Sequence, residues 1–130
     1  MLLRTVAAVG IAVAVLAACA TVPVYNVDKN AVTTASGKTP TAAEVRGAIL
    51  AAGGALGWSM SDAGPGLVRG NIALRSHTAA IEIPYSEKAY SIVYKSSTNL
   101  DESGGKIHKN YNGWIQNLER GINARITTLN

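Results

Sequence analysis

Cysteine is almost missing from this sequence, since Cys19 is the only one among 130 residues. A lone cysteine excludes an intramolecular disulfide, so the folded part of the chain must be stabilised by its core alone. Histidine is nearly as scarce: His77 and His108 stand far apart and lack the close H-x₃-H kind of spacing that zinc sites use. Asp101 and Glu102 are the carboxylates that could complete a metal site with them, but we predict no metal and no cofactor.

Dense basic runs and catalytic motifs are missing too. The chain has 12 Lys and Arg against 8 Asp and Glu, but no clustered basic patch, so we expect no nucleic acid as partner. It contains neither a G-x-S-x-G nucleophile elbow nor a G-x-x-x-x-G-K-[ST] phosphate loop. Ser97, His108 and Asp101 could form a triad only if the fold supplied the geometry. We therefore expect no enzymatic activity.

The first residues have the pattern of an export signal. Residues 1–4 carry a positive charge, residues 5–16 are an uncharged apolar run, and small residues follow. A membrane-spanning helix needs about 20 apolar residues, so this run is too short to cross a bilayer. The alternative interpretation is a buried N-terminal helix.

The four residues "LAAC", Leu16 to Cys19, resemble the lipobox of bacterial lipoproteins. The resemblance implies that residues 1–18 are a lipoprotein signal peptide and that Cys19 is lipidated. Several acyl chains anchor a protein stably, whereas a single chain gives only marginal membrane binding. Acylation would also remove the thiol from catalysis and metal binding. Ala20 stands where an Asp would retain a lipoprotein at the inner membrane, by analogy with enterobacterial sorting. We therefore expect an outer-membrane protein that faces the periplasm.

Two regions follow the signal. Residues 19–38 are rich in Thr, Ala, Ser and Asn, and we interpret them as the lipidated cysteine and a flexible tether. A strand around residues 22–27 that docks on the domain is the alternative. Residues 39–130 form the predicted domain. Without Arg4 the charge is 11 minus 8, or +3, which suits a surface near anionic lipid or peptidoglycan.

The domain begins with a helix and continues with strands. Either Thr39-Pro40 or a capping box of Thr41 and Glu44 starts the helix, and Gly53-Gly54 ends it. Alternating segments then predict four strands, within residues 56–61, 67–75, 78–85 and 89–96. The short connections between them favour an antiparallel meander with one apolar and one polar face.

A last helix follows a polar loop at residues 97–106. An apolar stripe at helical spacing defines it: Ile107, Tyr111, Trp114, Ile115, Leu118, Ile122 and Ile126. The predicted fold class is therefore α+β: a four-stranded antiparallel meander with two helices on one face, in the order α-β-β-β-β-α.

Polar side chains gather in two places. The possible binding residues are His108, Ser96, Ser97, Asn99 and Asn112, between the fourth strand and the last helix. The competing interpretation is structural, with Tyr111 and Trp114 in the core and His108 bonded to the Ser96-Ser97 loop. The polar sheet face carries Arg69, Asn71, Arg75, Glu82 and Lys95, where we favour a solvated face with cross-strand ion pairs.

Two segments also carry a family resemblance. "YSIVYKSSTNL", residues 90–100, and "IHKNYNGWIQNLERGI", residues 107–122, resemble a family of small, uncharacterised proteobacterial lipoproteins with a "Y-S-I-x-Y-x-S-S-x-N-L" strand before an "I-H-x-x-Y-N-x-W" helix. Trp58 and "AAIEIPY" fit the same pattern. The resemblance spans roughly residues 40–126 and implies an α+β domain behind a lipid anchor, without a known activity.

These observations predict a lipid-anchored periplasmic envelope protein, held at the membrane through the lipid on Cys19. We expect a non-enzymatic binding or structural module for another envelope component, either a protein or peptidoglycan. The alternative is a small cell-wall hydrolase or a metal-dependent envelope enzyme.

Overall fold

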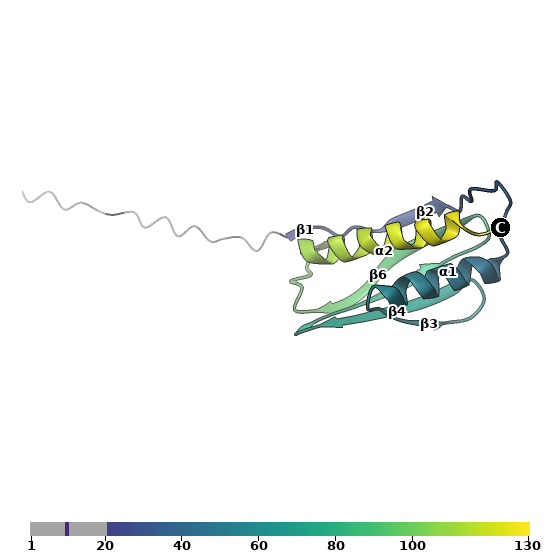
Figure 1. Ribbon diagram of the computed structural model, residues 1–130. Helices are drawn as coiled ribbons and strands as arrows, with labels where there is room; N and C mark the ends of the chain where they lie inside the picture. The colour runs from purple at the N-terminus through teal and green to yellow at the C-terminus, as the bar shows by residue number, and fades with distance from the viewer. Residues whose placement is uncertain (1–9, 11–20) are drawn as a thin grey trace, which may run out of the picture.

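The computed structural model describes Gly10 and residues 21–130, so the predictions for the signal peptide and for Cys19 lie outside the described residues. Seven strands and two helices follow one another in that part (Figure 1). In chain order they are β1 (Thr21–Pro23), β2 (Val27–Ala31), α1 (Ala42–Ala55), β3 (Ser59–Asp62), β4 (Leu67–Leu74), β5 (His77–Pro84), β6 (Ala89–Thr98), β7 (Lys106–His108) and α2 (Lys109–Thr127).

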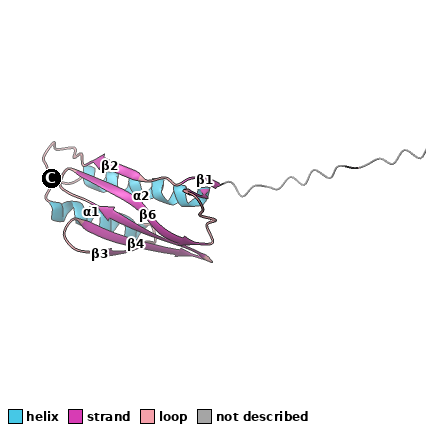
Figure 2. Cartoon of the chain, turned by 180° about the vertical axis from the view of Figure 1, so that it is seen from behind, coloured by secondary structure: helices cyan, strands magenta, loops and turns pink. Residues whose placement is uncertain are grey.

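The expected meander is present, but the predicted number of strands was wrong. The main sheet has five antiparallel strands in the order β2-β6-β5-β4-β3, because β2 adds to the outer edge of β6. β1 and β7 form a separate two-stranded ribbon. Both helices cover one face of the main sheet, while the other face is open (Figures 1 and 2). The fold is therefore α+β, with a larger sheet than the sequence predicted.

Local chemistry explains where α1 begins. The Thr41 hydroxyl accepts from the backbone N–H of Glu44 at 3.1 Å, and the Glu44 carboxylate accepts from the backbone N–H of Thr41 at 3.1 Å. Of the two predicted starts, the capping box is therefore the one that forms. The helix passes the predicted end at Gly53-Gly54 and finishes at Ala55, with Leu56 as its C-cap.

The last helix begins two residues later than predicted. Ile107 was placed in its first turn, but the structure puts this residue in β7, where it is paired with Val22. Its side chain is still buried, so it belongs to the core by way of a strand. The rest of the predicted stripe is on α2, and its buried residues are Tyr111, Ile115, Leu118, Ile122 and Ile126.

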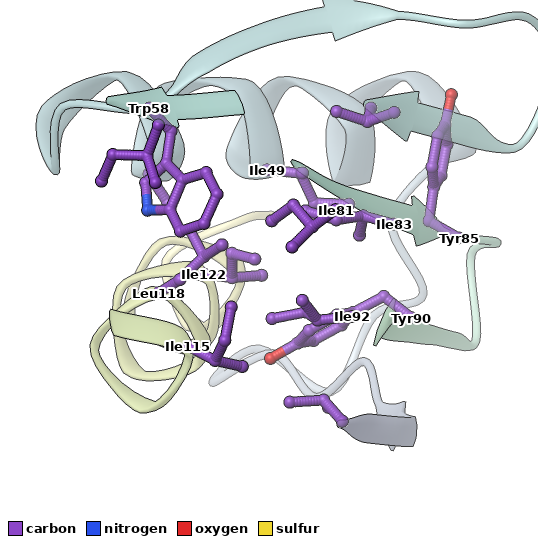
Figure 3. Packing of buried hydrophobic residues seen from close by; sticks show 14 of the residues in the cluster. Ile49, Trp58, Ile81, Ile83, Tyr85, Tyr90, Ile92, Ile115, Leu118 and Ile122 are labelled. Carbon is purple, nitrogen blue, oxygen red and sulfur yellow. The ribbon is translucent and has the colours of Figure 1, made fainter. Parts of the chain in front are cut away.

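The core lies between the helices and the sheet. Figure 3 shows Leu118 and Ile122 of α2 pointing toward Trp58, and Ile81 and Ile83 of β5 below α1. Two glycines let α1 approach the sheet here. A Cβ atom at Gly53 would lie 2.5 Å from Met60, and one at Gly70 would lie 2.8 Å from it. The Met60 side chain fills the space that the two missing Cβ atoms leave.

The predicted flexible tether is not observed from Thr21 onward. The backbone N–H of Val24 donates to the Gly105 carbonyl at 2.9 Å, and that of Ala35 donates to the Thr127 carbonyl at 2.9 Å. Together with β1 and β2, these bonds hold residues 21–38 along the length of α2. Residues 21–38, which were predicted to be a tether, therefore pack on the domain, and β1 and β2 overlap the docked strand of the alternative interpretation.

Candidate functional site

His108 caps the last helix. It is the N-cap residue of α2, and its Nδ1 accepts a hydrogen bond from the backbone N–H of Asn110 at 3.2 Å. Its own backbone N–H donates to the Leu100 carbonyl at 2.8 Å. The predicted bond to the Ser96-Ser97 loop is replaced by these contacts. The ring satisfies an N–H group that the helix start would leave without a partner.

Asn112 fastens the N-terminal segment to α2. Its Oδ1 accepts from the backbone N–H of Tyr25 at 2.9 Å, and its Nδ2 donates to the Pro23 carbonyl at 2.9 Å. The side-chain amide of Asn112 thus makes the two hydrogen bonds that a neighbouring strand would otherwise make. Their backbone partners lie 87 and 89 residues earlier in the sequence. Asn112 is better explained as a clamp on this segment than as a free ligand-binding group.

Ser97 contacts one of two tyrosines that pack against each other. Its Oγ lies 2.7 Å from the hydroxyl of Tyr94, and the Tyr94 ring meets that of Tyr111 edge to face, with centroids 5.4 Å apart. Tyr111 is fully buried, and its hydroxyl has no hydrogen-bond partner among the described residues. Burial, with a smaller contribution from Tyr94, raises the pKa of Tyr111 well above its usual value.

Asn99 holds a turn of the sheet. Its backbone has a positive φ of 57°, a conformation that Asn tolerates better than most residues. Its Nδ2 donates to the Ser76 carbonyl at 2.7 Å, and its own carbonyl accepts from Nδ1 of His77 at 2.8 Å. The two histidines therefore have separate structural partners, one at the β4–β5 turn and one at the start of α2.

The five possible binding residues thus do not form one site. His108, Asn112 and Asn99 each hold a local structure, and only Ser96 and Ser97 line a common hollow. That hollow, the outer-face depression, lies on the sheet and has a volume of about 420 Å³. It is lined by Ser59, Asn71, Ile72, Ala73, Thr78, Ala79, Ala80, Ser96, Ser97 and Thr98.

The strand register explains the outer-face depression. Ser59 pairs with Asn71, Asn71 with Ala80, and Ala80 with Ser96, so one row of small side chains crosses four strands. A second row continues it with Ala73, Thr78 and Thr98. Methyl, hydroxyl and amide groups therefore meet on the face opposite the helices, and its ten lining residues include no charged one.

Charged residues border this row, as expected. Glu82 lies 3.9 Å from Arg69 and 3.6 Å from Lys95, measured between its Oε1 and the nitrogen of each. The predicted cross-strand ion pairs on the polar sheet face are confirmed for these three residues. Exposed pairs of this kind stabilise a fold by only about 0–1 kcal/mol. Glu82 offsets one of the two positive charges, so this border of the depression keeps a net charge of +1.

A second hollow lies where α2 begins. This helix-end depression has a volume of about 590 Å³ and is lined by Val22, Lys109, Asn110, Asn112, Gly113, Trp114 and Gln116. The sequence placed Trp114 in the core. In the structure its side chain is half-buried and packs against the core from the edge. The indole is therefore partly buried against the core and partly exposed in the helix-end depression.

A polar network that was not predicted lies beside the apolar stripe of α2. The Tyr90 hydroxyl donates to Oδ1 of Asn123 at 2.7 Å. Nδ2 of Asn30 donates to the same hydroxyl at 2.8 Å and to Oδ1 of Asn123 at 2.7 Å. Burial raises the pKa of Tyr90 to about 12. The signal that could have revealed this network is the spacing of Asn112, Glu119 and Asn123, which share one helix face.

The same helix face also holds Tyr25. Its hydroxyl donates to Oε2 of Glu119 at 2.6 Å. This hydrogen bond is the main reason why the pKa of Tyr25 is raised, and burial and the charge of Glu119 add to it. Residues 21–31 are thus held by side chains from three successive regions of α2.

The side chains of the described residues are not arranged in a way that supports the enzymatic alternatives. Ser97 is bonded to Tyr94 and His108 to Asn110, so neither is arranged toward the other as a nucleophile and base would be. Residues 21–130 contain no group of three or more His, Cys, Asp or Glu side chains that could hold a metal ion. Neither described helix has the length and apolar character needed to cross a bilayer.

Comparisons with protein-family models, curated proteins and solved structures gave no match.

Proposed function

We propose that this chain is a lipid-anchored envelope protein of the outer membrane that faces the periplasm. Its domain is a non-enzymatic module that binds another envelope component, a protein or peptidoglycan, through the outer-face depression. The resemblance of the sequence to small proteobacterial lipoproteins supports the anchor. The membrane is its first partner, through acyl chains on Cys19, and the proposal requires no metal or cofactor.

The outer-face depression is the observation that carries the binding role. Ser59, Asn71 and Ser96 expose uncharged hydrogen-bonding groups. The short side chains of Ala73 and Ala80 form the bottom of the depression between them. Glu82 offsets one of the two positive charges of Arg69 and Lys95, so this border of the depression carries a net charge of only +1. A partner can therefore approach the backbone of the sheet closely, and hydroxyl and amide groups would determine its orientation.

The anchor is tested by labelling cells with a palmitate analogue. The wild-type chain should carry the label and sediment with outer membranes, whereas Cys19→Ser should lose both properties because the acylated group is gone. Equal labelling of the two chains would contradict the anchor.

The binding role is tested by in vivo photo-crosslinking from Ser96, with exposed Ala51 on α1 as the matched control position. A crosslinked species should form from Ser96 and be lost in Ala80→Arg, because the long side chain fills the depression. Ala51→Arg should leave it intact. A crosslinked species whose mass muramidase lowers identifies peptidoglycan as the partner, whereas a species that muramidase leaves unchanged and that yields peptides of a second chain identifies a protein. Equal crosslinking from both positions would overturn the proposal.

A further inference from the structure

Cys19 is close in sequence to the first strand that the structure describes. One residue, Ala20, separates that cysteine from Thr21, the first residue of β1. Consecutive Cα atoms are 3.8 Å apart, so the Cα atoms of Cys19 and Thr21 are at most about 7.6 Å apart. The headgroup layer on each side of a bilayer is about 5–7 Å thick. An acylated Cys19 would therefore bring β1 against the headgroups themselves.

Strand pairing shows which part of the domain this is. Thr21 is paired with His108, and Pro23 is paired with Lys106, so β1 lies beside the start of α2. In Figure 1 this end of the molecule is opposite the C-terminus. The side chains next to the point of attachment are therefore those of β7, the first turns of α2 and the helix-end depression.

These side chains have the chemistry of a membrane interface. Trp114 is half-buried and lines the helix-end depression, and a partly exposed indole favours the boundary between headgroups and acyl chains. Lys106 and Lys109 are exposed on either side of His108 and can reach phosphate groups. Asp101 and Glu102 lie in the loop before β7, but none of the described residues lining the depression is acidic.

We propose that the helix-end depression and β7 form a membrane-contact face, in which Trp114 enters the headgroup layer and Lys106 and Lys109 pair with lipid phosphates. This inference rests on the proposed acylation of Cys19. The occupant is the phospholipid leaflet that holds the anchor. The contact fixes the orientation of the domain, and the outer-face depression is then open toward the side, where a partner can reach it.

The test uses the acylated full chain in vesicles of phosphatidylethanolamine and phosphatidylglycerol, with lipids brominated near the headgroup as quenchers. Trp58 is 4% exposed in the core, so contact quenching should come from Trp114. We expect bromination to lower the emission of the wild-type chain by at least a third. Trp114→Phe should show less than a tenth of that quenching.

Lysine variants test the charge component. Each lysine near an anionic surface contributes about 5-fold in affinity. In the double variant Lys106→Gln and Lys109→Gln, quenching should fall by at least half. The control pair, Lys38→Gln and Lys88→Gln, removes the same charge near the far end of α2, about 28 Å away along a 19-residue helix, and should leave quenching unchanged.

Mass spectrometry of the same samples separates the two proposals. A chain without acyl groups on Cys19 would overturn the anchor, and with it the membrane-contact face. An acylated chain whose Trp114 is not quenched would overturn the contact face alone. Equal loss of quenching in the two lysine pairs would also overturn it, because the effect would then depend on total charge and not on position.

Discussion

Two buried tyrosines allow a sharp test of how hydroxyl groups affect the stability of this domain. Tyr111 is fully buried with no partner for its hydroxyl among the described residues, while Tyr90, 1% exposed, bonds to Asn30 and Asn123. The same change, Tyr to Phe, removes one oxygen from each. Because the two oxygens differ mainly in their hydrogen bonds, the two variants should change stability in opposite directions.

The expected magnitudes follow from the two environments. An unsatisfied buried hydroxyl costs about 1–3 kcal/mol. The void left by one oxygen is on the order of 10–15 Å³, the size of a water-sized probe, and at about 24 cal/mol per Å³ it costs about 0.3 kcal/mol. Tyr111→Phe should therefore stabilise the domain by about 1–2 kcal/mol. Tyr90→Phe should destabilise it by about 1–2 kcal/mol, since Asn30 and Asn123 lose a partner.

Equilibrium urea unfolding measures both values in one series. For a domain of this size, 1 kcal/mol also corresponds to a shift of about 4 °C in Tm, so thermal melts provide an independent check. A loss of more than 1 kcal/mol in Tyr111→Phe would refute the reasoning, because the hydroxyl would then have to make a favourable bond. Equal losses in the two variants would refute it as well.

Four further outcomes are expected. Stability should fall as the pH rises from about 10 toward about 12: the unfolded chain releases the Tyr90 proton near pH 10.0, whereas the folded chain keeps it until about pH 12. Tyr90 should account for at most about 3 kcal/mol of this loss, so the loss should be smaller in Tyr90→Phe; urea unfolding at each pH measures it. Asn112→Ala should cost about 1–3 kcal/mol and speed hydrogen exchange at the amide of Tyr25, and unchanged exchange would contradict the clamp. Trp114→Ala should cost about 1–2 kcal/mol in urea unfolding, below the 3–5 kcal/mol of a fully buried aromatic; a loss above 3 kcal/mol would place Trp114 in the core. Thr41→Ala should cost about 1 kcal/mol in the same assay through loss of the capping box, and no change would show that α1 starts without it.

The sequence predicted the meander and most of both helices because their signals are local. Alternation over eight residues in β4 and β5, and the capping box at Thr41, need no knowledge of the rest of the chain. β2 was missed because its sequence, "VDKNA", is polar and short, and it becomes a strand only by pairing with β6 about 60 residues away. A bulge between Val27 and Asn30 further hides its alternation.

The candidate site was harder to predict for the same reason. The grouping of His108, Asn112 and Ser96 was based on nearness in sequence, but strand register assigns Ser96 to a row with Ala80 and Asn71. The partners of Asn112 come from residues 23–25, which no local pattern connects to α2. Polar side chains that carry long-range contacts look the same in sequence as polar side chains that bind a ligand.

The antiparallel ribbon of β1 and β7 has a consequence for the order in which the domain folds. β1 pairs with residues 106–108, and β2 lies between β6 and side chains of α2 as far along as Asn123. Contacts between residues so far apart in sequence form late, because closing long loops costs entropy before the contacts can repay it. The residues of the domain made first on the ribosome therefore stay without partners until nearly the whole chain has been made. Until then β1 lacks the strand with which it pairs in the folded domain.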